Sequence, residues 1–239
     1  ARDTKEVLAA VERWIPTLDK AGEEYEHHMM EALWVHQWHN VVNRPLLERM
    51  LASPDHRARA AAARVLCHWR DRVTDSLGLF RKLAGDEHPR VRLEAVRAAS
   101  FYREAAAAGV ALAILKQPTD YYLDYTLGET MRQLDAWWRP ALASGRLVGE
   151  DNPAGVKYLV GRVNTAELLQ LPRTPEVMAA LLTRDGVSDA DRNLSLNGLA
   201  KARGTEPVAL LVSMLESGDA AGAANLARLV PYQDPADLK

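Results

Sequence analysis

Apolar residues recur along this chain at the three-to-four-residue spacing of an amphipathic helix, and short runs rich in Pro, Gly, Ser and Asp separate the periodic stretches. The apolar–polar alternation that marks strands is absent, and no strand–helix–strand rhythm occurs. The pattern therefore predicts an all-α protein built from helical hairpins. Helices are expected at 4–18, 23–39, 45–52, 77–84, 105–116, 121–138, 175–183, 189–202, 207–216 and 220–230, and in two Arg-rich stretches that begin at His56 and Pro89.

Turn and cap residues lie where these helices should begin or end. The groups Ser53-Pro54-Asp55, Gly85-Asp86 and Ser188-Asp189 place side-chain acceptors or turn formers just before three predicted helices. Such side chains satisfy the backbone N–H groups that a helix start leaves free. The caps therefore support the predicted boundaries.

The two Arg-rich stretches are copies of each other. HRARAAAARVLCHWR, from His56, aligns without a gap on PRVRLEAVRAASFYR, from Pro89, at an offset of 33 residues. Four arginines coincide in this alignment: Arg57 with Arg90, Arg59 with Arg92, Arg64 with Arg97 and Arg70 with Arg103. A two-helix period in the thirties or forties predicts an α-solenoid, whose repeats bury a continuous core by stacking. We expect helical hairpins over 1–138, an irregular helical joint over 139–173 and further hairpins over 174–239.

The net charge, the longest apolar run and the cysteine content limit which functions this chain can have. Lys and Arg number 30 against 32 Asp and Glu, and the net charge of −2 gives no global attraction to nucleic acid or to an anionic membrane. The longest apolar run, 105–115, is shorter than the roughly 20 residues needed to span a bilayer. The single Cys67 excludes a disulfide, a CxxC zinc site and a CxxCH heme site within these residues. We expect no cofactor, no membrane span and a protein partner.

The arginines have two interpretations. On a helical wheel Arg57 and Arg64 form one line and Arg59 and Arg70 form another, with apolar strips between them. In the structural interpretation the arginines pack over neighbouring hairpins and pair with acidic residues, namely Asp55, Asp71, Asp86, Glu87 and Glu94. In the functional interpretation Arg57, Arg64, Arg90 and Arg97 face an anionic partner. The series ends at the acidic Asp120 and Asp124.

Aromatic residues cluster at Tyr121, Tyr122, Tyr125, Trp137 and Trp138. They are interpreted either as packing residues or as the lining of a pocket beside Asp120 and Asp124. With the arginines they complete the candidate partner-binding set, which is Arg57, Arg64, Arg90, Arg97, Tyr121, Tyr125 and Trp138. A second apolar group, predicted as hairpin core, comprises Met29, Met30, Trp34, Trp38 and Val41.

Residues able to carry chemistry are sparse. His36 and His39 have the i, i+3 spacing of a metal clamp, but a third ligand is missing nearby, and core or interface roles are expected. Asp120 and Asp124 have a spacing that is common on helix surfaces. Gly-rich phosphate loops, GxSxG and HExxH are absent. We therefore predict that this segment is noncatalytic.

The stretch DEHPRVRLEAVRAAS, a turn followed by an Arg-bearing helix, resembles the HEAT repeat. Longer strings, including EALWVHQWHNVVNRPLLERML, SPDHRARAAAARVLCHWRDRV, PTDYYLDYTLGETMRQL and DNPAGVKYLVGRV, resemble the HEAT region of large bacterial PVC-type heme-binding CxxCH proteins, also described as membrane-bound dehydrogenase-like. That resemblance implies a preceding β-propeller, a following cytochrome c domain and export beyond the inner membrane. The abrupt ends ARDTKEV and PYQDPADLK fit the expectation of a segment of a longer protein.

Three hypotheses follow. The first is a noncatalytic scaffold that holds a protein partner or neighbouring domains within an exported redox protein. The second is a HEAT-like nucleic-acid-binding protein or DNA glycosylase that uses the arginine lines, which the net charge of −2 disfavours. The third is a surface that supplies His36 or Met29 to a heme on another domain. The His-Glu pairs of deoxyhypusine hydroxylase do not match, because Glu26-His27 and Glu87-His88 stand in reverse order.

Overall fold

The computed structural model describes residues 3–146, 152–217 and 220–233, and within these ranges it contains helices and turns but no strand. The all-α fold class is therefore confirmed. The helices are α1 (Thr4–Trp14), η1 (Ile15–Thr17), α2 (Tyr25–Trp38), α3 (Arg44–Leu51), α4 (His56–His68), α5 (Ser76–Ala84), α6 (Pro89–Ala99), α7 (Ala105–Leu112), η2 (Ala113–Lys116), α8 (Tyr121–Gln133), α9 (Asp135–Ala143), α10 (Pro153–Val160), α11 (Thr165–Gln170), α12 (Pro175–Thr183), α13 (Asp189–Arg203), α14 (Pro207–Ser217), α15 (Ala220–Ala227) and η3 (Val230–Tyr232).

Most predicted helix boundaries hold to within a few residues. The predicted helix over 121–138 is wrong as a single element, because it divides into α8 and α9 at Leu134. Of the irregular stretch 139–173 the structure shows the end of α9, then α10 and α11, while residues 147–151 lie outside the described residues. No described helix is both long and apolar enough to cross a membrane.

The predicted caps explain where helices start. Asp55 accepts a hydrogen bond from the Arg57 backbone N–H at 2.8 Å, and Ser188 accepts one from Asp191 at 3.1 Å. At α6 the capping side chain is His88 instead of Asp86, and its Nδ1 accepts from the Arg90 N–H at 3.2 Å. Asp86 in turn accepts from the His88 N–H, so it fixes the turn rather than the helix start.

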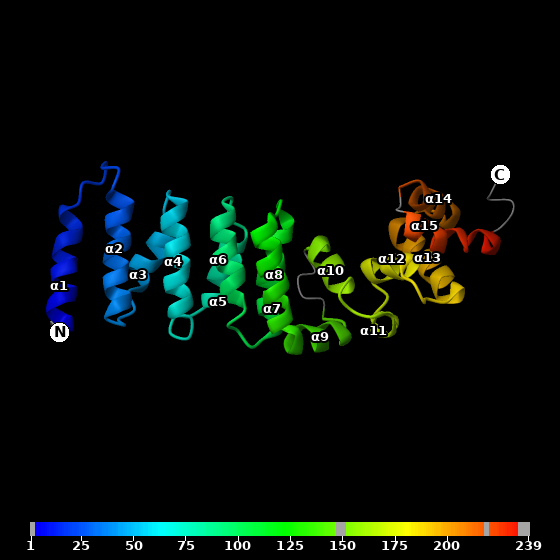
Figure 1. Cartoon of the computed structure of the whole chain (residues 1–239), viewed down its shortest axis with the longest axis horizontal. Coiled ribbons are helices and arrows are strands. Elements are labelled where there is room, and N and C mark those ends of the chain that lie inside the picture. Colours follow the sequence, from blue (N-terminus) through cyan, green and yellow to red (C-terminus); the bar gives the residue numbers. More distant parts are fainter. Residues whose placement is uncertain (1–2, 147–151, 218–219, 234–239) are drawn as a thin grey trace. The chain divides into compact units, whose positions relative to one another are not determined.

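Contacts divide the chain into two compact units, 1–137 and 138–239. In unit 1, α2, α4, α6 and α8 form a row in which each helix contacts the next, and α3, α5 and α7 pack against that row (Figure 1). α4 touches α2, α3, α5 and α6, in keeping with the apolar strips that its helical wheel shows between the arginines. Its alanines let these neighbours approach closely; Ala62 and Ala63, on different sides of the helix, are both fully buried.

Buried arginines join consecutive repeats of unit 1. Arg59, on α4, donates from Nη1 to the Ser53 carbonyl in the turn before its own helix, and from Nε and Nη2 to Asp86 in the next turn along. Arg92, at the equivalent position of α6, donates to the carbonyls of Asp86 and Glu87 and then to Gln117 and the Pro118 carbonyl. Each guanidinium therefore links the turn before its own helix to the turn of the following hairpin.

Unit 2 is a smaller helical stack. α12 pairs with α13, α14 pairs with α15, and α12 also contacts α10, α11 and α15. Its core contains Leu182, Leu196, Leu199, Leu211, Leu226 and Leu229. Arg192 on α13 repeats the arrangement of the buried arginines, since its Nη2 donates to the Arg184 carbonyl and to Asn225 on α15.

Candidate functional site

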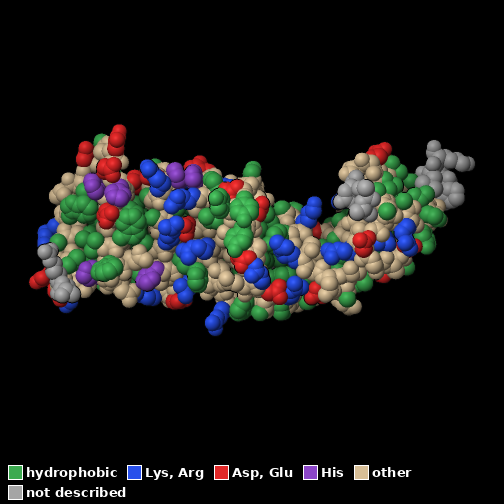
Figure 2. Space-filling model, viewed as in Figure 1, with side chains coloured by type: hydrophobic (Ala, Val, Ile, Leu, Met, Phe, Trp, Pro, Cys, Tyr) green, Lys and Arg blue, Asp and Glu red, His purple; other side chains and the backbone are tan. Residues whose placement is uncertain are grey.

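The exposed side of the α4–α6–α8 row carries six of the seven predicted partner-binding residues. Figure 2 shows this side, with basic side chains over α4 and α6 and an apolar patch over the start of α8. Each of these six residues is exposed, and together they define what we call the arginine–tyrosine face: Arg57, Arg64, Arg90, Arg97, Tyr121 and Tyr125. The seventh, Trp138, lies in unit 2.

The arginine–tyrosine face has an acidic centre beneath its surface. The Glu94 side chain, on α6, is buried and accepts hydrogen bonds from Arg64 Nε of α4 at 2.7 Å and from Arg97 Nε at 3.2 Å. One carboxylate therefore holds two guanidinium groups that remain about half exposed. Because Glu94 lies under both cations, it fixes their positions and reduces their combined charge.

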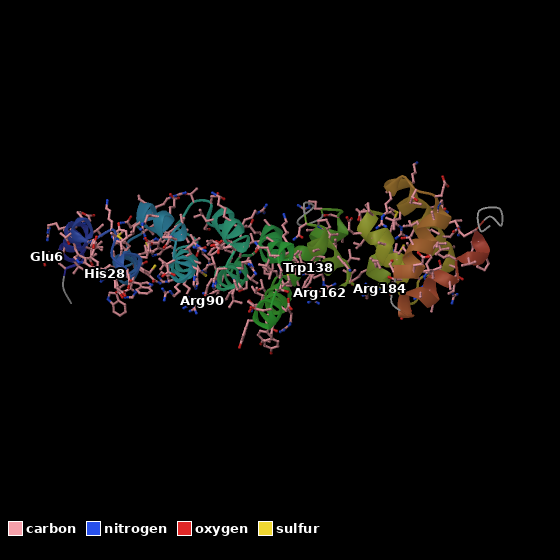
Figure 3. The ribbon with its side chains drawn as sticks, turned by 90° about the horizontal axis from the view of Figure 1, so that it is seen from above. Glu6, His28, Arg90, Trp138, Arg162 and Arg184 are labelled. Carbon is pink, nitrogen blue, oxygen red and sulfur yellow. The ribbon has the colours of Figure 1, made fainter. Side chains whose placement is uncertain are left out.

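The two arginines nearest the helix starts differ in their partners. Arg57 is paired with Asp55 at 3.2 Å, yet its side chain is 78% exposed. Among the described residues no carboxylate lies within ion-pair distance of Arg90, whose side chain points away from the ribbon (Figure 3). Both arginines are therefore accessible to an external anion, Arg90 without a competing carboxylate among the described residues.

The structural interpretation of the arginines is confirmed for all five acidic partners it named. Asp55 pairs with Arg57, Asp86 and Glu87 with Arg59, Glu94 with Arg64, and Asp71 with Arg70. The predicted line joining Arg59 and Arg70 is wrong, because α4 ends at His68 and Arg70 lies in the turn beyond the helix. Arg59 is also buried, whereas Arg70 is partly exposed.

The tyrosines at the start of α8 are surface residues. Tyr121, Tyr122 and Tyr125 are 74%, 69% and 61% exposed, so the packing interpretation is wrong for them. The rings of Tyr121 and Tyr125 stack with centroids 6.4 Å apart, and Tyr122 meets Tyr121 edge-on at 5.6 Å. Asp120 caps α8 by accepting from the Leu123 N–H. An exposed aromatic cluster of this kind is typical of an interaction surface.

Other predicted aromatic placements divide between core and surface. Trp138 is 1% exposed, with the Arg139 guanidinium over its ring, so it presents no surface to a partner and is a core residue. Met29 and Met30 are buried as predicted. The core prediction is wrong for Trp34, Trp38 and Val41, because all three lie on the surface, Trp38 at 87% exposure.

The two histidines with metal-clamp spacing have separate partners. His36 is buried, and the Asn43 amide Nδ2 lies 3.1 Å from its Nε2. The Nδ1 of His39 is 3.0 Å from the Thr4 hydroxyl. In the part of the chain that the structure describes, no group of three or more His, Cys, Asp or Glu could hold a metal ion. The thiol of Cys67 is buried, and that burial raises its pKa, which disfavours the nucleophilic thiolate.

A groove of about 730 Å³ lies at the opposite ends of the same helices. It is lined by residues of the turns after α4 and α6, by the end of α8 and by α9: Arg70, Asp71, Ser100, Phe101, Tyr102, Arg103, Gln133 and Trp137. We call it the C-terminal groove. The repeat alignment contained one signal for it, the coincidence of Arg70 with Arg103, but both residues follow the ends of their helices, where a helical wheel does not apply.

Comparison with known proteins supports the repeat assignment. Residues 43–132 match the family model for HEAT repeats, which covers α3 to α8 and therefore the arginine–tyrosine face. The α-solenoid fold class is thereby confirmed, and so are the HEAT-like hairpins predicted within residues 43–132. Searches of curated proteins and of solved structures returned no match.

Proposed function

We propose that this chain is a noncatalytic HEAT-repeat scaffold that binds a protein partner, or neighbouring domains of its own polypeptide, through the arginine–tyrosine face. The observation that carries the proposal is that the exposed cations and rings follow one another across the three neighbouring helices of the α4–α6–α8 row. Arg57 on α4, Arg90 on α6 and Tyr121 on α8 all lie in the first turn of their helices. A partner segment that crosses the row would meet a cation, a second cation and then an aromatic cluster.

The chemistry of this face suits a protein partner. Arginine and tyrosine are enriched at protein interfaces, since both combine a large contact area with hydrogen-bond donors. The Glu94 carboxylate under Arg64 and Arg97, together with the exposed Asp124 beside the tyrosines, reduces the attraction for a polyphosphate chain. Nucleic-acid binding, the alternative function, is therefore disfavoured but can be measured directly.

The test selects binding segments from a random peptide library displayed on phage, with the full chain as target. The face variant carries Arg57→Gln, Arg90→Gln, Tyr121→Ser and Tyr125→Ser. Arg64 and Arg97 stay in place, because removing them would leave the buried Glu94 without a partner. The matched control replaces exposed residues elsewhere, with Arg81→Gln and Lys82→Gln on α5 and Tyr232→Ser in η3.

We expect the selected peptides to bind the wild-type chain and the control variant with equal affinity. Their affinity for the face variant should be at least about tenfold lower. Peptides that bind the face variant as well as the wild type would show that the interface lies elsewhere. A labelled DNA duplex provides the second arm. Salt-dependent binding that the face variant abolishes would support the nucleic-acid function in place of this one.

A wider context is proposed from the sequence resemblance: that the scaffold is a segment of a larger exported redox protein with heme-binding and dehydrogenase-like domains. The strings quoted from α2 to α10 support this context. Sequencing the complete reading frame that contains this segment tests this context. A preceding β-propeller and a following CxxCH motif are expected, with an export signal at the start, and a frame that lacks both domains would reject it.

A further inference from the structure

The C-terminal groove carries more positive than negative charge. Arg70 is held in place because its Nη1 donates to the Cys67 carbonyl at 3.0 Å, and its other Nη lies 3.7 Å from Asp71. Arg103 is exposed, and no carboxylate of the described residues lies within ion-pair distance of it. The groove therefore holds two guanidinium groups and one carboxylate, which pairs with Arg70, and Arg103 can bind an external carboxylate in bidentate fashion.

The groove also contains an exposed aromatic ring with cations beside it. Phe101 is 49% exposed, and the guanidinium carbons of Arg70 and Arg97 lie 5.2 Å and 5.9 Å from its ring centroid. Two cations therefore lie next to one ring, about half of which stays exposed. Trp137 is half-buried and completes the apolar lining, and the exposed Gln133 adds an amide.

We propose that the C-terminal groove is a docking site for a partner-protein segment that carries an acidic side chain next to an aromatic one. The acidic side chain binds Arg103, and the aromatic ring packs between Phe101 and Trp137. The volume of about 730 Å³ accommodates two side chains of this size. This inference rests on the proposed function, to which it adds the chemistry of the partner and a second contact point on the same helices.

Charge favours a protein segment over a nucleic acid. Asp71 is largely exposed at the groove, where it would repel successive phosphates but can accept hydrogen bonds from the backbone N–H groups of a peptide. The residues that line the groove include two cations, Arg70 and Arg103. Arg97, which lies beside the groove, is paired with Glu94. A peptide segment with one carboxylate beside one aromatic ring therefore fits the groove better than a nucleic-acid backbone, whose phosphates are evenly spaced.

The test uses ligand-observed ¹⁹F NMR with the full chain. The probe is the peptide acetyl-Gly-Glu-(4-fluoro-Phe)-Gly-amide, and a second probe has Gln in place of Glu. The fluorine signal of the first probe is expected to broaden with the wild type, and the Arg103→Gln variant is expected to weaken binding about tenfold. Arg103→Lys should restore part of the affinity, because it keeps the charge but loses the two-point geometry. Arg81→Gln on α5, a charge loss of the same size at another exposed position, should have no effect.

Several results would overturn the inference: no broadening with the wild type, equal broadening with Arg103→Gln, or equal binding of the Glu and Gln probes. A single-stranded oligonucleotide that binds through Arg103 when the peptide does not would overturn it in favour of nucleic acid. Failure here is distinguishable from failure of the proposed function, since the arginine–tyrosine face variant leaves every groove residue intact. Phage-selected peptides can therefore still depend on that face when the groove probe fails.

Discussion

Arg59 and Asp86, 27 residues apart in the chain, form a bidentate ion pair. Nε and Nη2 of Arg59 donate hydrogen bonds to the two carboxylate oxygens of Asp86 at 2.8 and 2.9 Å. Both side chains are nearly buried. Burial alone would raise the pKa of Asp86, but the hydrogen bonds from Arg59 and from the His88 backbone N–H outweigh it and lower that pKa. The pair therefore joins one repeat to the next through a carboxylate that stays ionised.

Replacing Arg59 with Met should strongly destabilise unit 1. The substitution leaves the nearly buried Asp86 without its cation and frees the Ser53 carbonyl, so we expect a loss of about 3–5 kcal/mol in the free energy of unfolding. Urea denaturation followed by circular dichroism measures this loss. Arg57→Met, which removes an ion pair whose arginine is largely exposed, serves as control and should cost about 0–1 kcal/mol.

A double-mutant cycle with Asp86→Leu separates the pair from the other contacts of Arg59. If the pair is coupled, the double variant should lose less than the sum of the single losses, because neither buried charge is then left alone. Simple additivity, or an Arg59→Met cost below about 1 kcal/mol, would show that this pair does not hold the repeats together.

Serine in place of Tyr121 or Tyr125 should leave stability almost unchanged. Both rings are largely exposed, so each substitution is expected to change the free energy of unfolding by no more than about 0.5 kcal/mol. Trp138→Ala is the contrasting case, since the ring is buried and its removal should cost about 3–5 kcal/mol. Thermal and urea denaturation distinguish the two classes. A large loss for either tyrosine would mean that the ring belongs to the core.

The repeat architecture was predictable because its determinants are local. Helix starts follow from cap residues such as Asp55 and Ser188, and the offset of 33 residues between Arg57 and Arg90 is visible in the sequence itself. The acidic partners of the arginines were also predictable, because a buried guanidinium requires an acceptor and few carboxylates lie within reach. Residues 43–132, which match the HEAT-repeat family model, contain Asp55, Arg57 and Arg90.

Side-chain exposure was less predictable, because a wheel shows which residues share a face but not which face meets a neighbour. Trp38 and Trp138 are equally apolar, yet one is 87% exposed and the other 1%. Helix ends were a second source of error. The repeat alignment places Arg70 and Arg103 in the Arg-rich helices, but they lie beyond the ends of α4 and α6. The groove that they line depends on how those ends pack together.

The shared carboxylate of Glu94 gives a prediction about pairs of substitutions. Arg64→Gln alone should cost about 0.5–1 kcal/mol, because the side chain is half exposed and Arg97 still binds Glu94. Arg64→Gln with Arg97→Gln should cost more than the sum of the two, about 2–4 kcal/mol, since the buried carboxylate then has no cation. Adding Glu94→Gln should recover part of that loss. Urea denaturation of Arg64→Gln, Arg97→Gln, the double variant and the triple variant measures these losses. A strictly additive series would contradict the role of Glu94 as a common partner.

The lowered pKa of the buried His36 predicts that the stability of unit 1 depends on pH. Burial lowers the pKa of His36 below its ordinary value of 6.5, and the nearby Glu12 and the backbone of Val41 only partly oppose that effect, while His39 adds to it. The folded chain therefore binds this proton less readily than the unfolded chain does. The stabilisation is fully present above pH 6.5 and is lost as the pH falls below that value toward the folded pKa.

The variant His36→Gln removes this titration and keeps an acceptor for the Asn43 amide. It should be less stable than the wild type at about pH 8, and the difference should shrink steadily toward about pH 5, because only the wild type pays for protonating a buried ring. His68→Gln, at an exposed position on α4, is the control and should run parallel to the wild type. Unfolding curves at several pH values provide the measurement. A constant difference between His36→Gln and the wild type across this range would show that the buried imidazole does not set the acid sensitivity of the fold.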